Sequence, residues 1–193
     1  FVNGIDRTME PVRFAAARQA WFEFMPMLRP ADAPDRVHRA FEWGTLVDFT
    51  MLDVRSQRDK AIESNDPTTL LPTTDTALPS GAAIFDPDRT CLGAEQKAWF
   101  KDRLLTGDFT WRHIGHGYPF VALRLDDYDT PEARANPPEG FHVNGGKYLS
   151  TEQWDGYWAE RRELMDHLAE RNVENVIVTS GHTHIYFAAG LRP

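Results

Sequence analysis

Apolar residues recur every three or four positions in three segments of the chain, which predicts three amphipathic helices. The first is expected over residues 10–24, with these recurring side chains in the core: Phe14, Ala17, Trp21 and Phe24. The second helix opens at residues 92–96. The third is expected over residues 151–171, with Ser150 as the N-cap and Gln153 at the capping-box position.

Shorter apolar or alternating segments predict the strands of a sheet. Residues 37–43 alternate, which is typical of an edge strand, whereas residues 46–53 are nearly all apolar, which is typical of a central strand. Two further strands are expected, one at residues 110–115 and a buried one at Val176-Ile177-Val178. The order of helices and strands predicts a layered α/β domain with a mixed sheet.

Two stretches, residues 58–89 and 117–149, show almost no periodicity and are rich in turn-forming residues. We expect long loops there, and such loops in compact domains are usually lids, binding elements or insertions. The second stretch contains three carboxylates that could hold Ca²⁺: Asp126, Asp127 and Asp129. We expect them to be solvated instead, because no glycine-bearing twelve-residue loop surrounds them.

The composition of the chain argues against several classes of function. The chain has 193 residues, and 21 Lys and Arg against 29 Asp and Glu give a net charge of −8. No basic patch interrupts this acidic balance, so nucleic acid is not an expected partner. The single cysteine, Cys91, excludes an internal disulfide, and no apolar run is long enough to span a membrane.

The final predicted strand leads into a candidate metal site, Gly181-His182-Thr183-His184. Two histidines at positions i and i+2 point to the same side of an extended segment, so both imidazoles could bind one metal ion or two neighbouring ones. The alternative is that both histidines cap the strand and bond to nearby backbone. The carboxyl edge of the sheet, where this segment lies, is where α/β proteins place their chemistry.

Other polar residues also follow predicted strands. Asp53 and Arg55 lie two apart, so Asp53 could orient the guanidinium fork of Arg55 toward two phosphate oxygens. The alternative is a local ion pair that braces the following loop. His113 and His116 could both reach a cleft, although histidines in aromatic surroundings are more often hydrogen-bonded core or rim residues.

Four ordered motifs resemble the PhoD-like branch of the metallophosphoesterases, the alkaline phosphatase D and phosphodiesterase group. The first is Leu52-Asp53-Val54-Arg55-Ser56-Gln57-Arg58, similar to the family's Leu-Asp-Thr-Arg-Ser-x-Arg. The others are Thr90-Cys91-Leu92-Gly93-Ala94-Glu95-Gln96, Trp154-Asp155-Gly156-Tyr157 and the closing strand. Their order and spacing agree from about residue 14 to the end.

The resemblance implies an α/β/β/α sandwich with mixed sheets, of which residues 1–193 form the carboxy-terminal part of a single domain. It implies a metal-dependent phosphodiesterase or alkaline phosphatase in which metal-bound hydroxide attacks phosphorus. Arg55 would neutralise phosphate oxygens, and His184 would protonate the leaving oxygen. The substrate would be a small-molecule or lipid phosphoester. Export to the periplasm or the exterior is a further implication, although no signal is visible in this chain.

Two departures from the family pattern affect the metal site. The family usually has Gly-Asp-x-His where this chain has Gly181-His182-Thr183-His184, and nitrogen ligands favour Zn, Mn or Fe over Ca. The family's early ligand motifs would precede Phe1, and Asn3 would fit directly behind the last of them as a further ligand. Because His182, His184 and Asn3 carry no negative charge, we expect this chain to hold only half of an active site.

Two other functions remain open at this stage. The chain could be a non-catalytic fragment or pseudoenzyme whose histidine pair binds a metal or nothing. It could also belong to a different metal hydrolase that shares only the Gly-His-Thr-His end.

Overall fold

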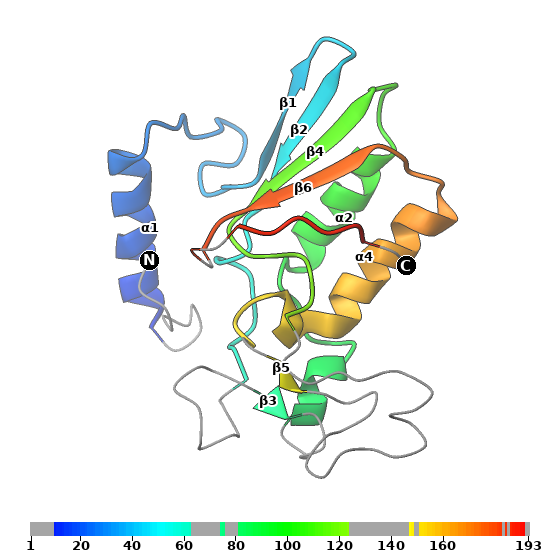
Figure 1. Ribbon diagram of the computed structural model, residues 1–193. Helices are drawn as coiled ribbons and strands as arrows, with labels where there is room; N and C mark the ends of the chain where they lie inside the picture. The colour runs from blue at the N-terminus through cyan, green and yellow to red at the C-terminus, as the bar shows by residue number, and fades with distance from the viewer. Residues whose placement is uncertain are drawn as a thin grey trace, which may run out of the picture.

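A four-stranded mixed sheet organises the chain in the computed structural model (Figure 1). Its order is β1-β2-β4-β6, with β1 (Arg39–Trp43) antiparallel to β2 (Val47–Met51). The strands β2, β4 (Trp111–His116) and β6 (Val176–Ser180) run parallel. The mixed α/β prediction is confirmed, as is the placement of β1 at an edge and β2 inside the sheet. The structure describes residues 10–62, 74–75, 81–123, 147–148, 151–182, 184 and 186–191.

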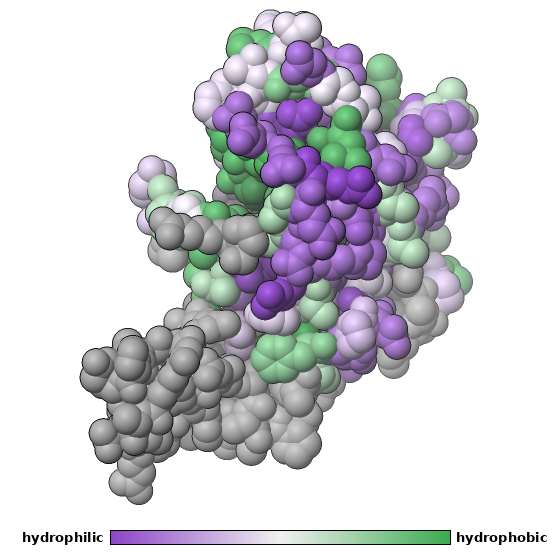
Figure 2. Space-filling view, turned by 90° about the vertical axis from the view of Figure 1, so that its right-hand side faces the viewer, coloured by the Kyte–Doolittle hydropathy of each residue, from purple (hydrophilic) through white to green (hydrophobic). Residues whose placement is uncertain are grey.

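Two helices cover one face of this sheet, α2 (Ala94–Leu104) and α4 (Trp158–Glu170) (Figure 1). The core between them and the sheet is built from buried side chains that include Leu52, Ile114, Phe100 and Leu164. The outer side of α4 is polar, as its Arg162–Asp166 ion pair illustrates, and that face of the molecule is largely hydrophilic (Figure 2). This contrast between the two sides of each helix fixes how the helices lie on the sheet.

The prediction of a buried closing strand is wrong. Among the described residues β6 pairs with β4 alone, so it lies at the edge of the sheet, and Ile177 is 42% exposed. Large apolar residues of other strands are exposed as well, among them Phe41, Trp43 and Trp111. The apolar run has the composition of a buried strand, but the described helices α2 and α4 cover one face of the sheet and leave Ile177 on the other exposed.

The first helix, α1 (Pro11–Phe24), forms as predicted but its aromatic residues do not enter the core. Only Phe22 is buried, while Phe24 is 85% exposed. Figure 1 shows α1 standing apart from the sheet, where it is connected to the following segment by an Arg18–Asp35 ion pair. The helical spacing of the apolar residues therefore predicted the conformation of this segment correctly but not the burial of its side chains.

The third helix begins later than predicted. A short 3₁₀ turn, η2 (Trp154–Tyr157), precedes α4, and no side chain caps its first turn. The expected cap, Ser150, lies outside the described residues. The backbone approaches itself closely at this turn, where a side chain at Gly156 would collide with the carbonyl oxygen of Thr151.

The two segments predicted as long loops lie largely outside the described residues. Their described parts include the 3₁₀ turn η1 (Gly81–Phe85) and two short strands, β3 (Thr74–Asp75) and β5 (Lys147–Tyr148). These strands pair with each other, Thr74 opposite Tyr148, so the two segments meet. In the part of the chain that the structure describes, no helix is both long and apolar enough to cross a membrane. The assignment of residues 1–193 to a single domain stays a prediction.

Candidate functional site

Three parallel strands deliver polar residues to the same edge of the sheet. Asp53 and Arg55 follow β2, Tyr118 follows β4, and His182 follows β6. Because the carboxyl ends of parallel strands coincide, residues far apart in the sequence are brought together there.

Asp53 organises the backbone at the end of β2. Its Oδ1 accepts hydrogen bonds from the backbone N–H groups of Arg55, at 3.0 Å, and Ser56, at 2.9 Å. The side chain of Gln96 holds the main chain of Asp53 from the other side, accepting from its N–H at 2.7 Å and donating to its carbonyl oxygen at 2.8 Å. These hydrogen bonds of the Asp53 carboxylate fix the turn from which Arg55 projects.

Tyr118 lies at the centre of the site. The guanidinium carbon of Arg55 is 4.7 Å from its ring centroid, and the ring of His182 packs edge-on at 5.0 Å. Arg58 donates a 2.9 Å hydrogen bond to the Tyr118 hydroxyl and a second bond to the carbonyl oxygen of Glu152. Because Tyr118 is buried, it is a fixed surface against which Arg55 and His182 are held.

The two histidines have a backbone conformation that is uncommon for their residue type. His182 has φ +83° and His184 has φ +55°, both in the left-handed region. Nε2 of His182 is 4.0 Å from Oε1 of Glu152, and burial together with the charge of Arg55 lowers the pKa of His182. A neutral imidazole is the form that binds a metal ion. Backbone strain of this kind clusters at functional sites.

The described residues supply only part of a metal site. They contain no group of three or more His, Cys, Asp or Glu side chains placed to hold one ion. His182 and His184 have the right chemistry and lie close enough for His184 to lower the pKa of His182. The proposed third ligand, Asn3, lies outside the described residues, as do Asp126 and Asp127. The metal assignment therefore stays a prediction.

The other two candidate histidines occupy opposite sides of β4. Nε2 of His113 lies 2.9 Å from the hydroxyl of Thr179, on the exposed face of the sheet. His116 is buried, and burial lowers its pKa to about 4. His113 and His116 therefore do not line the same cleft.

Sequence reasoning did not assign a site role to three residues, Arg58, Tyr118 and Glu152. Two signals were present: Arg58 belongs to the motif that contains Arg55, and Tyr118 follows a predicted strand by two residues. Glu152 had no such signal because the segment before α4 was expected to be helical.

The fold and this edge cluster define an α/β protein whose polar residues gather at the carboxyl ends of parallel strands. A family model described as PhoD-like phosphatase matches residues 6–193, and the chain belongs to that family. It is 29% identical over 184 residues to alkaline phosphatase D of Bacillus subtilis, covering 93% of this chain and 27% of that protein.

The fold comparison agrees. A solved structure titled "Structure of PhoD" superposes with a TM-score of 0.70 and 26% identity, covering 94% of this chain and 30% of that one. The chain thus spans less than a third of the length of either relative.

Proposed function

We propose that this chain is part of a metal-dependent phosphoester hydrolase, with His182 and His184 as metal ligands and Arg55 as a phosphate-binding residue. The observation that carries the proposal is the packing of Arg55 and His182 against one tyrosine, each within about 5 Å of the Tyr118 ring. A guanidinium fork beside a nitrogen ligand suits a phosphate that is bound by a metal and an arginine together.

Each residue of the edge cluster has a defined role in this proposal. Arg55 binds two non-bridging oxygens and neutralises charge that grows as phosphorus is attacked. Asp53 and Tyr118 hold Arg55 in place, and Arg58 holds Tyr118. His184 is exposed and serves as a metal ligand in this proposal, so the leaving oxygen takes its proton from another group.

A bound metal would supply the remaining chemistry by activating the attacking water and by screening phosphate charge. His182, His184 and Asn3 would contribute nitrogen and amide oxygen ligands, and this donor set suits Fe, Mn or Zn better than Ca. Carboxylate ligands would have to come from other residues, because these three carry no negative charge.

The names of the relatives support a phosphoester as substrate, either a small molecule or a lipid phosphoester. Alkaline phosphatase D is named for phosphatase activity, and the family is described as PhoD-like phosphatase. Nothing in the geometry of Arg55 and Tyr118 selects a monoester over a diester.

The test measures metal content and hydrolysis of bis(p-nitrophenyl) phosphate in the full-length protein that carries this chain. His182→Ala and His184→Ala should each lose metal and turnover together. His167→Ala is the matched control, because His167 lies on α4 with its Nε2 3.3 Å from the carbonyl oxygen of Lys101, and this variant should keep both. Full metal content in the His182→Ala and His184→Ala proteins would refute the ligand assignment.

A further inference from the structure

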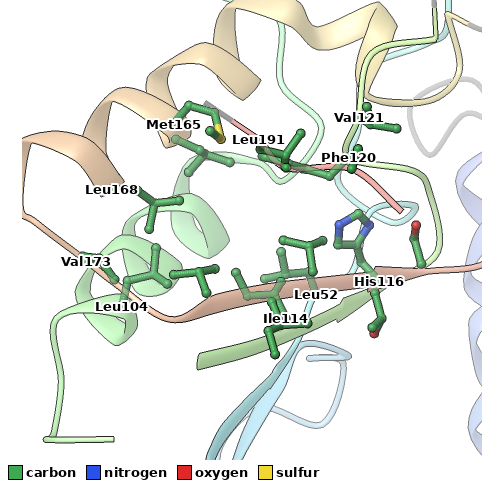
Figure 3. Close-up of a pocket in the computed structure, with 18 of the residues that line it drawn as sticks. Leu52, Leu104, Ile114, His116, Phe120, Val121, Met165, Leu168, Val173 and Leu191 are labelled. Carbon is green, nitrogen blue, oxygen red and sulfur yellow. The ribbon is translucent and has the colours of Figure 1, made fainter. Parts of the chain in front are cut away.

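A large cavity, lined mostly by apolar side chains, lies between the sheet and the helices. Its volume is about 930 Å³, and its walls come from β4, β6, α2, α4 and the segment after residue 185. Figure 3 shows Leu104, Met165 and Leu168 from the helices facing Leu52 and Ile114 from the sheet side. A cavity of this size and composition is in the range that binds small organic molecules.

One polar side chain stands out in this wall. His116 lies at the end of the cavity beside Phe120 and Val121 (Figure 3) and is only 8% exposed. Its Nε2 atom is buried and has no hydrogen-bond partner among the described residues. A buried polar atom without a partner is costly, so this position calls for a bonded ligand.

The other ring nitrogen of His116 identifies which kind of atom would satisfy Nε2. The backbone N–H of Tyr118 donates to Nδ1 across 3.3 Å, so Nδ1 is an acceptor and the proton resides on Nε2. Burial lowers the pKa of His116 to about 4, which keeps the ring neutral at physiological pH. The His116 side chain therefore offers one N–H donor and no positive charge.

The charges of the lining residues indicate which net charge a ligand of this cavity can carry. Among the described residues of the lining, Glu174 is the only one with a formal charge at neutral pH, and no Lys or Arg is present. An anionic head group would be desolvated there without a cation to balance it. One water could accept from Nε2, but the part of the wall formed by Leu104, Ile114 and Met165 offers no hydrogen-bond partner to further water.

We propose that this cavity binds a neutral, elongated apolar molecule whose single acceptor oxygen, a ketone or ester carbonyl, receives the hydrogen bond from His116 Nε2. The site does not depend on phosphoester hydrolysis. It lies on the helix-covered side of the sheet, whereas Arg55 and His182 meet at the strand ends.

The test uses 2-nonanone as the probe and nonane as the matched molecule without oxygen. Isothermal titration of the full-length protein that carries this chain should show saturable binding of 2-nonanone. The affinity for 2-nonanone relative to that for nonane should be about tenfold higher in the wild type than in His116→Phe, the increment of one hydrogen bond. The ¹⁵N resonance of His116 Nε2 should shift on addition of 2-nonanone and stay in place with nonane.

Substitutions on β4 provide the control. His116→Phe should lower the affinity ratio of 2-nonanone to nonane about tenfold, whereas His113→Phe, on the other side of the same strand, should leave this ratio as in the wild type. If His116→Phe does not fold, the wild-type resonance measurement decides alone. Three results would overturn the proposal: no saturable binding, equal affinity for the two probes with an unmoved Nε2 resonance, or tighter binding of anionic nonanoate than of 2-nonanone.

Discussion

The hydroxyl of Thr90 donates a hydrogen bond to Oε1 of Glu160 across 2.7 Å, joining the loop before α2 to the first turn of α4. The same carboxylate accepts from the backbone N–H groups of Cys91 and Leu92. Glu160 is almost completely buried, and Lys97 Nζ lies 3.6 Å from it. One side chain therefore satisfies three donors of the loop before α2.

Glu160→Met should destabilise the fold by about 2–3 kcal/mol, because a methionine of similar size offers these buried donors no acceptor oxygen. Glu163→Met is the control: Glu163 is 42% exposed in its ion pairs with Lys97 and Lys101, and such pairs contribute less than about 1 kcal/mol. Urea unfolding monitored by circular dichroism measures both. Equal losses in the two variants would contradict the role assigned to Glu160.

A second prediction concerns Gly156 in the 3₁₀ turn before α4. A Cβ atom there would lie 1.8 Å from the carbonyl oxygen of Thr151, a backbone atom that cannot rotate away. Gly156→Ala should cost about 1–3 kcal/mol or more in the free energy of unfolding, as overpacked sites do. Gly181→Ala, where no atom lies within 4 Å, should leave stability nearly unchanged in the same thermal or urea unfolding experiment.

These two positions illustrate what the sequence does and does not reveal. The family motif around Cys91 was recognised, but not the hydrogen bond from its backbone to Glu160, 69 residues further along the chain. Gln96 is similar: it belongs to a helix by its period, yet its function is to hold the main chain of Asp53. Periodicity predicts helices and strands because it reports local burial; it does not report such long-range hydrogen bonds.

The candidate site was predictable only in part for the same reason. Arg55 and His182 follow predicted strands, so the meeting of parallel strand ends could place them together in advance. The ring between them, Tyr118, required knowledge that β4 lies between β2 and β6. Burial was the least predictable property, as Ile177 and Phe24 show, because it depends on which faces are covered.

A third prediction concerns acid stability. The pKa of His116 is lowered by burial to about 4, whereas the unfolded chain would titrate near 6.5. Between these values the unfolded state binds more protons than the folded state, so stability must fall as pH decreases from about 6.5 to 4. The contribution of this one group is roughly 3 kcal/mol over that window.

The measurement is the free energy of unfolding at several pH values between 4 and 7. His116→Phe should flatten the slope across this window, while His113→Phe should leave it as in the wild type. A His116→Phe slope identical to that of the wild type would mean that the buried ring is not what resists protonation.

The last prediction addresses Arg55. If its two-pronged guanidinium holds two phosphate oxygens, Arg55→Lys should lower kcat/KM for bis(p-nitrophenyl) phosphate by at least about tenfold, because an ammonium point charge cannot replace a bidentate fork. The fold should survive, since a lysine can retain a cation–π contact with Tyr118. Arg162→Lys, on the exposed side of α4 and paired with Asp166, controls for arginine replacement as such. Kinetics within a factor of two of the wild type for Arg55→Lys would show that Arg55 braces the turn after β2 and does not bind phosphate.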